Sequence, residues 1–217
     1  MIKIINSQKL IELYKQGYFP MAKNSYSEKI SFYKPEKRFI IPINSFHIPK
    51  KLFSDFKKTS FNFKINHQFI KIIDNCSKIN KKRKETWINP IIRNTYINLY
   101  KLGYAKSIEC YDGCKIIGGL YGVHIGKCFF GESMFSLQNN TSKFCLLFLI
   151  SLLKHNSFTL LDSQFFNRHL LQFGAYEITN KNYELKLQDG ILGLSNFPES
   201  FNFQKSVSIL QSLSHKS

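Results

Sequence analysis

Two tight-turn signals divide the stretch from Ser107 to Ser133, and they constrain the fold more than any other feature of the chain. Asp112-Gly113 is the stronger one, because an Asp-Gly pair readily adopts the positive φ angles of a two-residue hairpin turn. Gly126 serves the second turn. The turns separate three short apolar segments: Ser107–Tyr111, Lys115–Val123 and Lys127–Ser133. The sequence therefore predicts a three-stranded antiparallel meander.

Hydrophobic periodicity and turn residues on either side of the meander give the other elements. Before it, helices are predicted at Ser7–Gln16, with Ser7 as N-cap, at Gln68–Ser77 and at Asn89–Leu102. In the last of these, Asn89 is expected to be the cap, Pro90 the first helical residue and Gly103 the residue just past the end. Strands are predicted at Arg38–Ile43 and Phe61–Ile65. Pro42 favours an edge position for the first strand. After the meander come a helix at Asn140–Lys154, a buried strand at Phe158–Gln164 and a short helix at Arg168–Phe173.

This order of elements is typical of a mixed α/β (α+β) fold, and specifically of GNAT-like N-acyltransferases, an analogy that concerns the fold alone. Residues 1–38 are expected to form a small N-terminal domain, in which residues 22–33 read as an irregular linker. Residues 39–217 are expected to form the GNAT-like catalytic domain. The last ~15 residues are expected to be disordered.

Basic residues are concentrated in one part of a chain whose formal net charge is +17. From Phe46 to Lys84, eleven Lys and Arg residues face two acids, a balance of +9 that ends in the run Lys81, Lys82, Arg83 and Lys84. From Ala105 to Phe165, five lysines face four acids. A basic segment beside a near-neutral one indicates a polyanion-binding face next to a separate site. The alternative is a solvated charged surface.

Several classes of protein are disfavoured by what the sequence lacks. The five cysteines form no CxxC pair and the six histidines no HxxxH or HExxH pattern, so no metal site or disulfide framework is expected. No stretch approaches the roughly 18–20 uninterrupted apolar residues of a membrane span. The N-terminus also lacks the apolar block of a signal peptide. We expect a cytoplasmic protein, with a monomer favoured.

Three polar residues in the apolar second half are candidates for chemistry. Glu132 and Asp162 lie inside the apolar runs FFGESMF and FTLLDSQFF, where a carboxylate needs a partner or a task. On a strand, Asp162 and Gln164 would share one face about 7 Å apart. The alternative is a satisfied buried polar network. Glu109 and Asp112, by contrast, lie at the hairpin and are expected to be exposed.

The turn that precedes the Asn140–Lys154 helix bears on the acyl donor. Acyl-CoA enzymes of this fold hold pyrophosphate with a glycine-rich turn at this point, whereas residues 136–141 here read SLQNNT. Coenzyme A is therefore disfavoured, and the basic segment offers tRNA as another acyl carrier.

Several motifs together resemble the leucyl/phenylalanyl-tRNA–protein transferase family. They are GYFPMA, PEKRFIIPINSFHIP, TWIN, GGLYGVHIGKCFFGESMFS with the continuation NNTSK, and LLDSQFFNRHLLQFGAYEI. The combination of GGLYGV, FFGESMFS and a later D-x-Q is specific. The resemblance implies an enzyme that transfers Leu or Phe (Met less well) from tRNA to proteins beginning with Arg or Lys. Such proteins are thereby marked for degradation by the N-end rule.

The resemblance also implies roles for individual residues. Asp162 and Gln164 match the catalytic D-x-Q, and Glu132 matches the acid of the GESMFS motif, which would hold the ammonium group of either donor or acceptor. Trp87 and Tyr96 would lie near the bound aminoacyl-adenosine. The amino-acid pocket would be formed by Leu120, Phe129, Met134, Leu149 and Leu161, for which the alternative is ordinary core packing.

The expected partners are Leu-tRNA, Phe-tRNA and acceptor proteins, with no metal or diffusible cofactor and no membrane. Two rival hypotheses stay open. One is a CoA-dependent acyltransferase of the same fold. The other is a non-catalytic RNA-binding protein, although no RRM- or OB-type stacking motif is visible.

Overall fold

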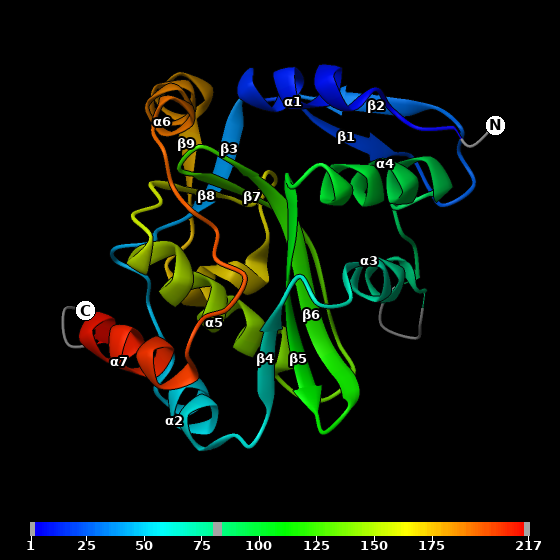
Figure 1. The fold of residues 1–217 in the computed structure, drawn as a ribbon. Helices are drawn as coiled ribbons and strands as arrows, with labels where there is room; N and C mark the ends of the chain where they lie inside the picture. Colours follow the sequence, from blue (N-terminus) through cyan, green and yellow to red (C-terminus); the bar gives the residue numbers. More distant parts are fainter. Residues whose placement is uncertain (1–2, 80–83, 215–217) are drawn as a thin grey trace.

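The computed structural model describes residues 3–79 and 84–214 (Figure 1). A seven-stranded sheet has the order β4-β5-β6-β7-β8-β3-β9, and a separate two-stranded sheet pairs β1 with β2. The strands are β1 Phe19–Ala22, β2 Ile30–Tyr33, β3 Lys37–Ile41, β4 Asn62–Ile65, β5 Ala105–Asp112, β6 Lys115–Ile125, β7 Cys128–Ser136, β8 Leu160–Asp162 and β9 Tyr176–Thr179. The helices are α1 Ser7–Lys15, α2 Lys50–Lys58, α3 Phe69–Ser77, α4 Pro90–Lys101, α5 Thr141–His155, α6 Asn180–Leu192 and α7 Phe203–Ser214, with a 3₁₀ helix at Arg168–Phe173.

The predicted meander is confirmed as β5, β6 and β7, which pair antiparallel with one another. Gly113 and Gly126 occupy the two turns with φ angles of 55° and 60°. After β7 the chain runs through α5 and returns as β8 parallel to β7. This single parallel pair makes the large sheet mixed, so the α+β prediction is confirmed.

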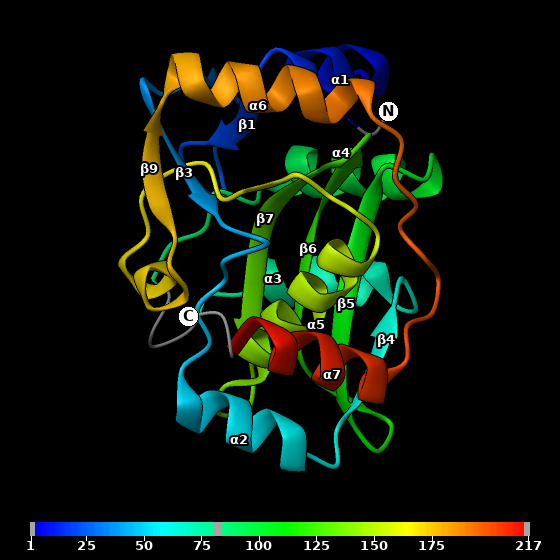
Figure 2. The same ribbon diagram turned by 90° about the vertical axis from the view of Figure 1, so that its left-hand side faces the viewer.

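Helices cover both faces of the large sheet. In Figure 2, α5 and α7 lie in front of the strands, while α3 and α4 lie behind them. One hydrophobic core joins the buried side of α5 to α2 and α7, and a second joins α1, α3, α4 and α6 on the opposite face. Within the described residues, no helix combines the length and apolar character that crossing a bilayer requires.

Sequence signals located the caps of α4 correctly. Asn89 accepts a hydrogen bond from the Ile92 amide at 2.8 Å, Pro90 is the first helical residue, and Gly103 follows the end with φ 83°. The cap of α1 was predicted one residue late, because Asn6 rather than Ser7 accepts from the Lys9 amide.

Other expectations about the fold were wrong. β3 is an interior strand between β8 and β9, because it ends at Ile41 and the missing N–H of Pro42 costs no strand pairing. The expected linker, residues 22–33, contains strand β2, which pairs antiparallel with β1. Of the last 15 residues, which were expected to be disordered, Phe203–Ser214 form α7, in which the Ser206 hydroxyl contacts the Ser151 hydroxyl at 2.6 Å. A domain boundary at residue 38 stays a prediction.

The described residues of the basic segment lie on both sides of the large sheet. Its helix α2 packs into the core beside α5, whereas α3 packs into the core on the other side of the sheet. Lys81, Lys82 and Arg83 lie outside the described residues, and Lys84 is exposed. Their role in binding tRNA stays a prediction.

Candidate active site

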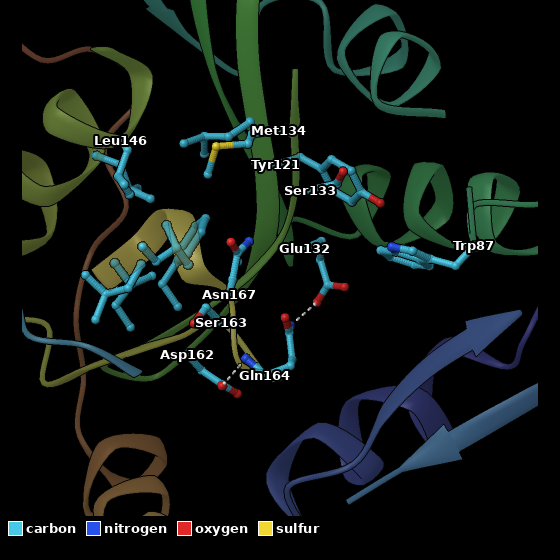
Figure 3. Close-up of a pocket in the computed structure, with 17 residues that line it drawn as sticks. Trp87, Tyr121, Glu132, Ser133, Met134, Leu146, Asp162, Ser163, Gln164 and Asn167 are labelled. Atoms are coloured by element: carbon cyan, nitrogen blue, oxygen red, sulfur yellow. Dashed lines mark hydrogen bonds between the residues drawn. The ribbon is translucent and has the colours of Figure 1, made fainter. Parts of the chain in front are cut away.

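A cavity of about 260 Å³ opens between β6, β7, β8 and α5. Every residue predicted for catalysis or substrate binding lines it except Tyr96. The lining includes Trp87, Leu120, Phe129, Glu132, Met134, Leu149, Leu161, Asp162 and Gln164. In Figure 3, Met134 and Leu146 lie toward one end of the cavity, and Trp87 lies toward the other, beyond Glu132. The cavity therefore has an apolar end and a polar end.

A β-bulge places Glu132 at the polar end. On β6, Tyr121 pairs with Ser133 and the next residue, Gly122, pairs with Gly131, so Glu132 is an extra residue without a partner in the ladder. Such an insertion redirects the side chain and disturbs the alternation of the strand. Gly122 suits this position, because a Cβ there would collide with the Phe130 carbonyl oxygen and the Phe129 ring.

The same bulge brings Phe129 and Met134 to one face of β7. These residues are five positions apart and would point to opposite faces of a regular strand. With the extra residue between them, both pack in the core beside α5 and both line the cavity. Phe129 is fully buried whereas Met134 is half-buried, so Phe129 lies deeper.

The Asp162 carboxylate is surrounded by donors. Arg38 Nε lies 2.9 Å from Oδ1, and Arg38 Nη2 lies 2.6 Å from Oδ2. The backbone amide of Gln164 donates to Oδ1 at 2.8 Å, and the Tyr183 hydroxyl donates to Oδ2 at 2.8 Å. Although burial lowers the pKa of Arg38, the charge and hydrogen bonds of Asp162, together with the smaller effects of Tyr183 and Glu132, raise it by more, so the net pKa is raised. The two residues form a buried, hydrogen-bonded ion pair.

The sequence predicts that Gln164 and Asp162 share one face of a strand, and this prediction is wrong. β8 ends at Asp162, and Gln164 has a left-handed backbone with φ 62°. The Asp162 side chain turns toward Arg38. The Gln164 side chain instead points to Glu132, with Nε2 3.4 Å from Oε1 (Figure 3). The hydrogen bond from the Gln164 amide to Asp162 holds this unusual turn in place.

Two buried tyrosines donate hydrogen bonds to the Glu132 carboxylate. Tyr14, on α1, donates to Oε1 at 2.7 Å, and Tyr96, on α4, donates to Oε2 at 2.8 Å. Burial raises the pKa of Glu132 to about 7, although the hydrogen bonds from both tyrosines lower it. Burial, and next the charge of Glu132, raise the pKa of both phenols well above the usual value. The phenols are therefore donors at neutral pH.

A second cavity of about 180 Å³ adjoins the first. It is lined on one side by Phe19, Phe165 and Phe166. The two cavities share five lining residues: Trp87, Glu132, Ser163, Gln164 and Asn167. Glu132 and Gln164 therefore border both spaces.

Sequence reasoning missed Arg38, Tyr14 and Tyr183. The sequence could have indicated a role for Arg38, because it begins the apolar run RFIIPI and a charged side chain buried in such a run needs a partner. The two tyrosines carry no such signal, since each reaches its carboxylate from a helix distant in the sequence.

Glu109 was predicted to be exposed and is fully buried instead. Its carboxylate accepts from the Gln68 amide at 2.8 Å, the Ser107 hydroxyl at 2.9 Å and the Tyr111 hydroxyl at 2.6 Å. Alternation along β5 puts these side chains on one face. Glu109 therefore holds the start of α3, away from the cavity, while Asp112 is exposed as predicted.

Known proteins resemble this chain at two levels. In sequence, the model of a family described as "Leucyl/phenylalanyl-tRNA protein transferase" matches residues 40–188. In structure, a functionally unknown conserved protein from Staphylococcus epidermidis has 8% identity and a TM-score of 0.42 over 82% of this chain and 66% of that one. L-PGS from Bacillus licheniformis has 9% identity and a TM-score of 0.43 over 95% of this chain and 69% of that one.

The TM-scores of both structural matches are too low to support an inference about this protein. The chain also spans less than two thirds of the length of the first matched protein. The sequence match is different, because it covers more than half of the chain and includes the bulge, β8 and Gln164. The chain belongs to the leucyl/phenylalanyl-tRNA protein transferase family of aminoacyltransferases.

Proposed function

We propose that this protein transfers Leu or Phe, and Met less well, from aminoacyl-tRNA to the N-terminal α-amine of proteins that begin with Arg or Lys. The product would be marked for degradation by the N-end rule, in the cytoplasm. The observation that carries the proposal is the two-ended cavity, in which an apolar space adjoins a carboxylate and an amide.

The apolar end suits an unbranched-at-Cβ donor side chain. Its walls come from three strands and one helix, and they are formed by Leu120, Phe129, Met134, Leu149 and Leu161. Met134 supplies a flexible thioether that adapts to either an aliphatic or an aromatic group. An apolar pocket separates such side chains by about 1–3 kcal/mol per methylene-sized misfit, so Ile and Val should be rejected strongly but not completely.

The reaction is the aminolysis of an activated ester, which depends on positioning and proton handling. Gln164 would orient the incoming amine through its side-chain carbonyl, while Asp162 holds the Gln164 backbone. Glu132 would face an ammonium group. The leaving group is the ribose hydroxyl at the tRNA 3′ end, and the ester needs no further activation by a cofactor.

The order of β5, β6, β7, α5 and β8 is the basis for proposing a GNAT-like fold for the catalytic region. The turn before α5 contains no glycine. The left-handed backbone conformation in this turn is adopted by Asn140, with φ 62°. A pyrophosphate cradle of the acyl-CoA type would use glycine here. This favours tRNA over coenzyme A as the acyl carrier.

The test is to incubate purified protein with radiolabelled Leu-tRNA and a protein bearing N-terminal Arg. Label should enter the acceptor, and the same acceptor with an acetylated N-terminus should stay unlabelled. Acetyl-CoA should give no product. Binding of tRNA without transfer would identify a non-catalytic RNA-binding protein, and turnover of acetyl-CoA would favour the rival acyltransferase.

A further inference from the structure

The group that removes the proton from the acceptor amine is constrained by the surroundings of Asp162. An N-terminal α-amine carries a proton below a pH of about 7.7–8.0 and must lose it before attack. Four donors already reach the Asp162 carboxylate. Oδ1 accepts from Arg38 Nε and the Gln164 backbone amide, and Oδ2 accepts from Arg38 Nη2 and the Tyr183 hydroxyl, with Arg38 Nε also within 3.1 Å. These four donors fill the acceptor sites of the carboxylate. A proton on Asp162 would displace one of them.

Glu132 has different surroundings, because it forms a closed ring of oxygen contacts with Tyr14 and Tyr96. Tyr14 lies 2.7 Å from Oε1, Tyr96 lies 2.8 Å from Oε2, and the two hydroxyl oxygens lie 2.5 Å apart. Three contacts require three protons, and the two phenols supply two. While Glu132 is ionised, both phenols donate to it and the contact between their oxygens holds no proton. One proton taken up by Glu132 completes the ring.

The position of this ring fits a proton acceptor. Glu132 lines both cavities, and its Oε1 lies 3.4 Å from Gln164 Nε2. An amine held by the carbonyl oxygen of the same Gln164 amide would lie beside the Glu132 carboxylate. Transfer of its proton would need no movement of the backbone.

The charged and titratable groups around Glu132 come from five elements: Tyr14 on α1, Tyr96 on α4, Tyr121 on β6, Asp162 on β8 and Arg38 on β3. Burial raises the pKa of Glu132 to about 7, the Asp162 charge acts in the same direction, and Arg38 and both tyrosine hydrogen bonds lower it. A base with a pKa near the working pH is efficient, because a substantial fraction of it is ionised and it still binds a proton well.

We propose that Glu132, held by Tyr14 and Tyr96, is the group that takes the proton from the α-ammonium of the acceptor. This inference rests on the proposed function. The ammonium proton moves to the Glu132 carboxylate, and the freed amine nitrogen bonds to the ester carbonyl carbon. The bond from that carbon to the ribose oxygen breaks, and the ribose oxygen receives the second amine proton. Glu132 then releases its proton to solvent, which completes the exchange of ester and ammonium for amide, alcohol and one proton.

The protonation of Glu132 is measured directly by infrared titration of its carboxylic C=O band, identified by its loss in Glu132→Gln. In the wild type the band should disappear as the pH rises through about 7. Tyr14→Phe and Tyr96→Phe each remove a hydrogen bond that lowers the pKa, so the midpoint should move to higher pH in both. A band absent from the wild type below pH 6 would overturn the inference.

The catalytic role is measured by single-turnover transfer at saturating substrates over the same pH range. The rate midpoint should move upward in Tyr14→Phe together with the infrared midpoint, whereas the pKa of the acceptor amine is the same for both enzymes. Glu132→Gln should be about 10²–10⁴-fold slower, as is typical for loss of a proton-transfer group. An unshifted rate profile in both tyrosine variants, with a shifted infrared midpoint, would overturn the inference.

Tyr111→Phe is the matched control, because it removes a buried tyrosine hydroxyl from Glu109, a carboxylate outside both cavities. It should lower stability and leave both midpoints unchanged. Tyr14 and Tyr96 lie on different helices, so one variant is expected to fold even if the other does not. Failure of the proposed function differs from failure of this inference: the first gives no transfer from Leu-tRNA by the wild type, and the second gives normal transfer with an unshifted profile.

Discussion

Arg38 and Asp162 form a two-point ion pair in the interior of the protein, with side chains only 1% and 0% exposed. The guanidinium reaches both carboxylate oxygens, and its remaining terminal nitrogen donates to the Gly17 carbonyl at 2.8 Å. β3, β8 and the end of α1 are thereby tied together at the residue that holds Gln164. Arg38 is therefore a positioning residue for the cavity.

Replacing Arg38 with Met should destabilise the protein by about 3–5 kcal/mol, because Asp162 would be left as an uncompensated buried charge. The control is Arg93→Met, which breaks the half-exposed Arg93–Asp74 pair, with side chains 34% and 39% exposed. That change should cost about 0–1 kcal/mol. Urea unfolding followed by circular dichroism measures both, and equal losses would contradict the special role of Arg38.

Gln164→Ala and Gln164→Gly should separate the strain at this position from its chemistry. Both remove the amide, so both should lower single-turnover transfer about 10²–10⁴-fold while tRNA affinity changes little. The left-handed backbone suits Gly, so the Ala variant should be less stable by about 1–2 kcal/mol. Near-normal transfer by either folded variant would remove Gln164 from the mechanism.

Asp162→Asn should also reduce turnover far more than tRNA affinity, but for a different reason. An amide has only one oxygen and cannot accept from Arg38 at both positions, so the turn that carries Gln164 loses its anchor. The variant should therefore lose stability as well as rate. A folded Asn variant with full stability and slow transfer would favour a direct chemical role for Asp162 instead.

Met134→Ala should widen the apolar end of the cavity and improve Phe transfer relative to Leu transfer. Met134 is the half-buried wall, whereas Phe129 is fully buried and belongs to the core. The competition is measured with Leu-tRNA and Phe-tRNA in one reaction. If the ratio is unchanged, or if the wild type transfers Ile or Val as fast as Leu, the pocket assignment is wrong.

Glu132→Gln should stabilise the protein at pH 8 and have little effect at pH 4. Folding raises the pKa of Glu132 from its usual value near 4.5 to about 7, so the folded state binds the proton more tightly than the unfolded state. The stability this group contributes is thus present below pH 4.5 and is lost as the pH rises through 7, by up to about 3 kcal/mol. The difference between variant and wild type in urea unfolding at the two pH values isolates this group.

Neutralising Lys81, Lys82, Arg83 and Lys84 together should weaken tRNA binding and flatten its salt dependence by up to ~3 units of log–log slope. The basic run stands out in the sequence, and each lost phosphate contact removes roughly 0.7–0.9 units. Binding titrations at several salt concentrations measure the slope. An unchanged slope would assign the main tRNA contact to another part of the chain.

Local signals predicted the meander, the caps of α4 and the helix α5, because turns, caps and apolar periodicity depend on neighbouring residues. They failed where distant pairing decides the outcome. The interior place of β3 and the burial of Glu109 depend on partners from other elements. The sequence marked Glu132, Asp162 and Gln164, but Arg38 pairs with Asp162 across 124 positions and Tyr14 contacts Glu132 across 118.

Because Glu132 is an extra residue in β7, its side chain contacts groups on both sides of the large sheet. Glu132 borders the cavity on the α5 side of the sheet and is bonded to Tyr14 and Tyr96, which pack in the core on the opposite side. Any change in the protonation of this carboxylate therefore alters hydrogen bonds of α1 and α4, so the N-terminal helix is connected to the cavity through a single side chain.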